Sequence, residues 1–107
     1  MKHLGKITNA EFGLQRDYPF MFGLQLEFSF DGSCVGDGGM YTINIYSGCK
    51  WDSAEQKAEA VEKCIIDTVD VLKDAKVNNV SQLKDKPVEV ELDGNLFKSF
   101  RILTEVL

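Results

Sequence analysis

The chain has 107 residues and a formal net charge of −5, which is the length of one domain and an acidic balance. Its apolar fraction of 44% supplies enough hydrophobic side chains for one core, which excludes an intrinsically disordered chain. The acidic balance disfavours a general nucleic-acid binder, because such binders gain affinity from basic residues that displace counterions. We therefore expect a single domain over residues 1–107.

Cysteine usage and hydropathy indicate the compartment. The three cysteines, Cys34, Cys49 and Cys64, are an odd number and cannot form a closed disulfide framework. The first residues lack the apolar core of a signal peptide, and no run of about 18 apolar residues is present to span a membrane. We expect a protein of the reducing cytosol that has no membrane partner.

The first predicted elements are a strand over residues 2–12, a turn at residues 13–19 and a long strand over residues 20–30. In the long strand, large apolar side chains alternate with smaller or polar ones, which is the pattern of a strand with one buried face. We expect its two end residues to reach beyond the core, toward a hairpin or a second subunit. The six apolar positions are Phe20, Phe22, Leu24, Leu26, Phe28 and Phe30.

A glycine-rich loop, residues 31–39, is predicted to join the long strand to a third strand over residues 40–46. The loop does not fit a phosphate-binding P-loop, because it lacks the Gly-Lys-Ser/Thr ending and enters a strand instead of a helix. A flexible connection is the simpler interpretation, and a loop that closes over a partner is the functional one. The candidate binding residues are Asp31, Gly32, Gly36, Asp37, Gly38 and Gly39.

A long helix is predicted over residues 53–76. Asp52 or Ser53 can cap its N-terminus, and apolar residues at steps of three and four form one face. We expect this face to pack along the long strand. The face consists of Ala54, Ala58, Val61, Ile65, Thr68, Val69, Leu72 and Ala75. Its centre is predicted to lie over Phe22, Leu24, Leu26 and Phe28.

The chain is predicted to end with a short helical turn over residues 80–83 and a hairpin formed by residues 88–103. Asp93-Gly94-Asn95 separates two alternating runs, which is typical of a hairpin turn, with the register left open by one residue. The order β-β-β-α-β-β predicts an α+β fold with five mainly antiparallel strands and one long helix packed on the sheet. An open sheet and an OB-like barrel both fit this order.

No residue pattern indicates catalysis or metal binding. His3 is the only histidine, and no nucleophile motif accompanies it, so we expect it to be exposed at a frayed terminus. The cysteines are too widely spaced for a zinc site. Cys49, just before the helix, lacks a partner base, and Cys64 is expected to be buried. The sequence therefore predicts neither enzymatic activity nor a metal or cofactor.

The C-terminal hairpin offers a second functional interpretation. Basic and aromatic residues alternate there, as in modules that bind single-stranded nucleic acid, which would fit an OB-like fold. Acidic residues lie on the same hairpin, and Phe97 or Phe100 must point into the core in either register. The candidate nucleic-acid contacts are Lys84, Lys86, Lys98 and Arg101.

Several short segments point to an origin. They include residues 5–7, 17–20, 49–51 and 86–90, and the most specific one is the ending over residues 97–107. In these segments the chain resembles a family of small uncharacterised proteins encoded by bacteriophages and prophages of Gram-positive bacteria. The resemblance implies a phage or prophage origin, and with it the cytoplasm of a bacterial host. It implies no functional residues.

Our main hypothesis is a non-enzymatic, phage-derived binding protein that acts on a host or phage macromolecule, with a host or phage protein as the expected partner. A counter-defence role, in which an acidic surface competes for a basic groove, is one form of it. The alternative is an OB-like module that binds single-stranded nucleic acid. A carrier that closes the glycine loop over a small ligand is the third hypothesis, and oligomers are compatible with all three.

Overall fold

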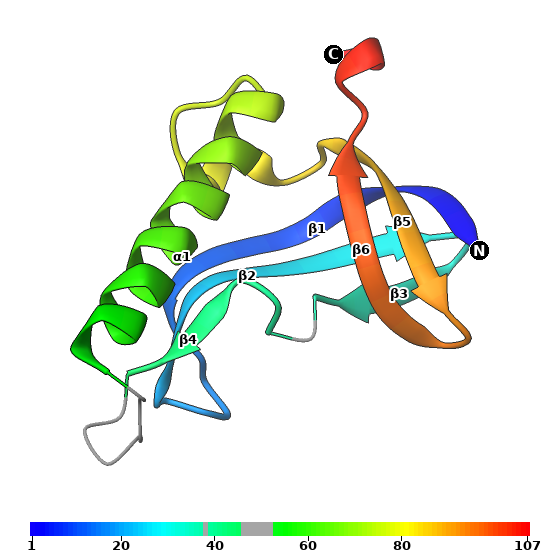
Figure 1. Ribbon diagram of the computed structural model, residues 1–107. Coiled ribbons are helices and arrows are strands. Elements are labelled where there is room, and N and C mark those ends of the chain that lie inside the picture. Colours follow the sequence, from blue (N-terminus) through cyan, green and yellow to red (C-terminus); the bar gives the residue numbers. More distant parts are fainter. Residues whose placement is uncertain (38, 46–52) are drawn as a thin grey trace.

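A computed structural model of the chain describes residues 1–37, 39–45 and 53–107. Six antiparallel strands form one open sheet (Figure 1). Five of them follow the order β3-β2-β1-β5-β6, and the sixth, β4, pairs with the first residues of β2, whereas β3 pairs with its last residues. One long helix, α1 (Ala54–Asp74), lies between β4 and β5 in the chain. The predicted α+β class is confirmed, in the form of an open sheet. The strands are β1 (Lys2–Leu14), β2 (Met21–Phe30), β3 (Ser33–Gly36), β4 (Thr42–Asn44), β5 (Pro87–Asp93) and β6 (Leu96–Ile102).

The predicted glycine loop contains a strand of its own. Asp31 and Gly32 have φ values of 48° and 77°, as in the type I′ turns that join two-residue hairpins, and they connect β2 to β3. The prediction of five strands was therefore wrong by one. The strand predicted over residues 40–46 is the shorter β4, and residue 46 lies outside the described residues.

The apolar face of β2 is the centre of the core, as predicted. Leu24, Leu26 and Phe28 are at most 2% exposed. Phe30 is also buried, and the ring of His3 stacks on it with centroids 4.7 Å apart. The expectation of a peripheral Phe30 was wrong, because β1 extends to the end of β2 and covers it. Phe20 lies before β2 and is exposed.

His3 is part of β1 and does not fray. It pairs with Val90 of β5, and its Nδ1 atom lies 3.5 Å from a carboxylate oxygen of Asp31. The amino group of Met1 donates a hydrogen bond to the carbonyl of Leu92 at 2.9 Å. These contacts, which link residues far apart in the sequence, explain why the expectation of an exposed terminal histidine was wrong.

The hairpin of β5 and β6 folds over β2. Figure 1 shows β6 crossing in front of β1 and β2, and the ring of Phe28 contacts Phe97 and Phe100 with centroids 5.4 Å and 4.8 Å apart. A register shift between Glu91 and Leu92 leaves Lys98 without a pairing residue, which is a β-bulge. Because of the bulge, Phe97 and Phe100 both lie on the core side of β6. The sequence alone leaves the register open by one residue, with at least one of the two rings in the core.

The helix begins where the sequence predicts. Ser53 is its N-cap, and the Ser53 hydroxyl accepts a hydrogen bond from the backbone N–H of Gln56 at 3.0 Å. The helix approaches the sheet closely at Gly23, where a Cβ atom would lie 2.3 Å from the Tyr41 carbonyl oxygen and 3.0 Å from the Cys64 sulfur. Glycine at this position therefore permits the contact between the helix and β2.

The helix buries only part of the predicted face, in which Thr68 and Ala75 are buried and Leu72 packs against the core. Its buried side chains are Cys64, Thr68 and Val71, whereas Val61, Ile65 and Val69 are 39–48% exposed. The predicted contacts of these three residues with the long strand were wrong. The apolar arc of the helix is wider than the surface that the sheet offers to it, and the sequence pattern does not specify which part of the arc meets the sheet.

The remaining segments agree with the predicted organisation. The turn η1 (Val80–Leu83) precedes β5, and a second short turn, η2 (Thr104–Val106), follows β6. Within the described ranges, α1 is the only long helix, and it is too polar to cross a membrane.

Candidate binding groove

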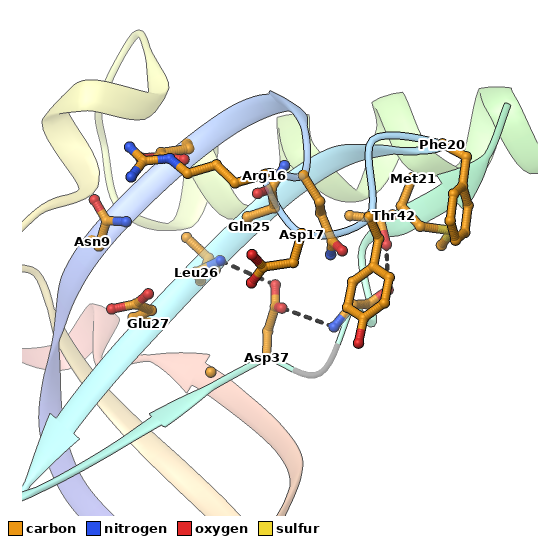
Figure 2. A pocket seen from close by; sticks show the side chains of 15 residues that line it. Asn9, Arg16, Asp17, Phe20, Met21, Gln25, Leu26, Glu27, Asp37 and Thr42 are labelled. Carbon is orange, nitrogen blue, oxygen red and sulfur yellow. Dashed lines mark hydrogen bonds and ion pairs between the residues drawn. The ribbon is translucent and has the colours of Figure 1, made fainter. Parts of the chain in front are cut away.

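A groove of about 660 Å³ lies on the polar face of β1 and β2, the face that does not carry the core (Figure 2). Side chains of a strand alternate between faces, so the positions of β2 between the core residues point into this groove. The loop between β1 and β2 and the segment after β3 complete its walls. Its charged, amide and aromatic lining consists of Asn9, Glu11, Gln15, Arg16, Asp17, Tyr18, Phe20, Gln25, Glu27 and Asp37.

Strand pairing sets the floor of the groove. Glu11 pairs with Gln25, and Asn9 pairs with Glu27, so four polar side chains form two adjacent rows. The Gln25 amide donates to the Gly13 carbonyl at 2.9 Å, which fixes its orientation. The floor is therefore rich in hydrogen-bonding groups held in the register of two paired strands.

Two aromatic rings form one rim. The loop over residues 15–20 is closed by hydrogen bonds from Gln15 N to Met21 O at 3.0 Å and from Met21 N to Tyr18 O at 2.9 Å. Tyr18 and Phe20 are 58% and 41% exposed, and their rings meet edge to face with centroids 6.1 Å apart. Large exposed rings on a constrained loop are well placed to contact a ligand.

Asp37 is the buried acid of the groove. Its carboxylate accepts hydrogen bonds from the backbone N–H groups of Leu26 at 3.1 Å and Gly39 at 3.0 Å, and Figure 2 shows both bonds. Its own N–H donates to the Leu26 carbonyl at 3.0 Å. Burial raises the pKa of Asp37, although the hydrogen bonds from Gly39 and Leu26 act in the opposite direction.

Asp37 has a structural role. It occupies the gap along β2 between the pairing regions of β3 and β4, and its side chain bonds the Leu26 N–H that no strand reaches. Each of the two carboxylate oxygens accepts a hydrogen bond from a backbone donor, which fixes the orientation of the side chain. The carboxylate stabilises the wall on which the groove depends.

The groove carries excess negative charge. Its lining has four carboxylates and one guanidinium, and Arg16 lies 3.4 Å from Glu11. Asp17 and Glu27 have no ion-pair partner among the described residues. Carboxylates beside exposed aromatic rings favour ammonium and guanidinium groups, through charge and through contact with the ring faces.

The predicted glycine-loop site is divided by the fold. Gly36, Asp37 and Gly39 line the groove, as part of its wall. Asp31 and Gly32 form the turn at the other end of β3. Gly38 lies outside the described residues.

The four basic candidates lie elsewhere. Lys98 and Arg101 are on β6, and Lys84 and Lys86 are in the link between η1 and β5. The Lys98 ammonium lies 2.9 Å from Glu91, and the hydrogen bond to that carboxylate raises the pKa of Lys98. Arg101 lies 3.3 Å from Glu89. These ion pairs offset the positive charge that a phosphate would meet.

The aromatic residues of the same hairpin face inward. Phe97 and Phe100 both contact Phe28, so their rings are engaged in the core. Stacking of bases on a single-strand binder requires accessible rings. The hairpin therefore offers less to a nucleic acid than its sequence suggests.

Sequence reasoning missed most of the groove. It treated residues 13–19 as a plain turn, although Arg16, Asp17 and Tyr18 lie there next to an exposed Phe20. The available signal was an aromatic-acidic cluster beside Pro19. The polar positions of β2, including Gln25 and Glu27, were placed correctly on the face away from the core.

Comparisons with known protein families, curated proteins and solved structures find no match to the chain. In the part of the chain that the structure describes, no group of three or more histidine, cysteine, aspartate or glutamate side chains is arranged to hold a metal ion.

Proposed function

We propose that the chain is a non-enzymatic binding protein whose groove receives a basic segment of another protein. The observation that carries the proposal is that Asp17 and Glu27, which have no ion-pair partner in the part of the chain that the structure describes, share one open cavity with two exposed rings. The rings are those of Tyr18 and Phe20. A lysine or arginine side chain satisfies both kinds of group at once, because its stem packs on a ring while its charge meets a carboxylate.

A protein partner fits better than a nucleic acid. The groove has the same sign of charge as phosphate, and the chain as a whole carries a net charge of −5. An acidic chain is also attracted over a distance to a basic surface, which raises the rate of association. A phage-derived protein that covers a basic nucleic-acid-binding surface of a host protein would use these features, and the phage origin stays a prediction.

The proposal is tested by titrating the protein with a short fluorescent arginine-rich peptide and measuring anisotropy. We expect binding that weakens as salt is added, because the contacts are between charges. Asp17→Asn and Glu27→Gln are each expected to weaken binding by about threefold to tenfold. Capture from a host lysate then serves to identify the natural partner.

Asp93→Asn is the matched control, since it removes one negative charge at the β5–β6 turn, away from the groove lining. If this variant binds the peptide as weakly as Asp17→Asn does, binding follows net charge and the groove is not the site. Absence of peptide binding at low salt would also contradict the proposal.

A further inference from the structure

The outer face of α1 carries an ordered set of exposed side chains, which we call the outer stripe. Its positions follow one another at steps of three and four residues, so they share one side of the helix, within an arc of about 100°. This side is opposite the buried face with Cys64 and Val71. The outer stripe consists of Glu59, Glu62, Ile66, Val69 and Lys73. Lys76 follows the helix end with a φ of 58°, so it does not continue the stripe.

The centre of the outer stripe is apolar and exposed. Ile66 and Val69 are 48% and 39% exposed, and neighbouring Val61 and Ile65 are also exposed. A helix at the surface of a single domain normally carries polar residues on its outer side. Four exposed β-branched side chains on one helix are typical of a surface that another molecule covers.

The charges of the outer stripe are ordered along the helix. The two glutamates precede the apolar centre, and Lys73 follows it. None of the three has an ion-pair partner in the described ranges 1–37, 39–45 and 53–107. Lys63 pairs with Asp67 at 2.7 Å instead, and this pair lies to one side of the stripe.

This order is self-complementary when two copies of the helix run antiparallel. About a two-fold axis midway between Ile66 and Val69, Glu62 of one copy faces Lys73 of the other. The apolar centres then face each other, and the opposed helix dipoles attract. A parallel pair would place like charges together.

We propose that the outer stripe of α1 is a dimer interface with a second copy of this chain, antiparallel and two-fold symmetric. Steps of three and four residues are the spacing that lets two helices pack at a small crossing angle. A two-fold interface uses the same patch on both copies, which is what the self-complementary order of the stripe provides.

The proposed dimer is small and leaves the groove free. A 21-residue helix is about 30 Å long, so one helix pair lies at the small end of specific interfaces and dissociates on dilution. The groove lies on the polar face of the sheet, whereas α1 covers the apolar face. A dimer therefore presents two grooves, which increases the avidity for a partner with two basic segments.

Sedimentation velocity over a range of concentrations tests the dimer. We expect the wild-type protein to change from monomer to dimer as concentration rises. Glu62→Lys alone and Lys73→Glu alone are each expected to raise the dimer dissociation constant about tenfold, because the two-fold axis applies each change twice.

The decisive sample is an equimolar mixture of the two single variants. In the mixed dimer, each of the two contacts between position 62 of one copy and position 73 of the other again joins opposite charges. We therefore expect a dimer dissociation constant near the wild-type value. The double variant Glu62→Lys/Lys73→Glu is expected to regain self-association in the same way. Asp93→Lys, which makes the same charge change on the β5–β6 turn, is expected to leave self-association unchanged.

Three results would overturn the proposal. One is a wild-type protein that remains monomeric at the highest concentration it tolerates. Another is a mixture that associates no better than either variant alone. The third is a dimer that neither single variant weakens, which would place the interface on another surface. Circular dichroism of each variant confirms that the helix is retained.

Discussion

The hairpin of β5 and β6 and the helix α1 both cover the apolar face of the sheet, but they do so to different extents. The hairpin contributes Val88, Val90 and Ile102, all at most 4% exposed. The helix contributes its narrow buried face and leaves four large apolar side chains at the surface, among them Ile65. The core is therefore mainly a contact between strands, with the helix added at one end of the sheet (Figure 1).

This difference indicates how stability is distributed. Regions with many buried apolar contacts open only when the whole domain unfolds, whereas weakly covered elements open at a lower free energy. We expect the hairpin and β2 to be the most stable unit and α1 to open separately. Substitutions in the two regions test this expectation.

The largest expected effect is at the contact between β2 and the hairpin. Phe28→Ala removes a fully buried ring that touches both Phe97 and Phe100, so we expect the free energy of unfolding to fall by about 3–5 kcal/mol. Denaturant unfolding followed by circular dichroism measures the loss. A loss below about 1 kcal/mol would contradict a core centred on Phe28.

The next effect is at the contact between β2 and the helix. Gly23→Ala places a methyl group against the Tyr41 carbonyl, and we expect a loss of about 1–3 kcal/mol. Hydrogen exchange is expected to show lower protection in α1 than in the hairpin. Gly13→Ala is the matched control, because Gly13 pairs with Gly23 and has a similar φ of 156° but no atom within 4 Å of the added methyl.

Local patterns predicted the elements well, and contacts between distant segments decided the rest. The alternation in the long strand and the cap at Ser53 depend on neighbours in the sequence. The cap is confirmed, and the alternation is confirmed over residues 24–30, whereas Phe20 lies before β2. The buried face of α1 depends on the width of the sheet beside it, which no local pattern contains. The position of His3 depends on β5 and on Asp31, so it was also missed.

The groove was hard to predict for a similar reason. It forms only when the loop over residues 15–20 and the segment after β3 meet on the polar face of β2. Asp37 was proposed as a binding residue, and it reached the groove as part of its wall. Tyr18 and Phe20 were assigned to a turn and to a strand end, because each interpretation satisfied the local pattern.

A smaller effect is expected at Asp37. Asp37→Asn keeps the shape but loses an acceptor for one of two backbone donors, so we expect a loss of about 1–2 kcal/mol. Asp17→Asn, in the same groove without such bonds, is the control and is expected to change stability little. Equal losses in the two variants would contradict the structural role of Asp37.

The stability that Asp37 contributes should also depend on pH. Burial raises its pKa in the folded protein above the ordinary value of 3.8, so the folded state holds the proton more tightly than the unfolded state. The stability gained by protonation is complete below 3.8 and is lost as pH rises through the raised folded pKa. We therefore expect the free energy of unfolding of the wild-type protein to exceed that of Asp37→Asn by more at pH near 3.8 than at neutral pH. Urea unfolding of both proteins measures the difference.

The smallest effect is expected on the exposed side of α1. Ile65 is 48% exposed, and alanine favours helices more than isoleucine does, so Ile65→Ala should change the free energy of unfolding by less than about 0.5 kcal/mol. Val71→Ala on the buried face of the same helix should cost about 1–2 kcal/mol more, because it leaves a cavity. Both are measured in dilute protein, where the proposed dimer is dissociated. A loss for Ile65→Ala that equals the loss for Val71→Ala would mean that both sides of α1 are covered within one chain. The hairpin and the helix would then be covered to a similar extent within one chain, and the exposed side of α1 would no longer support an interface with a second copy.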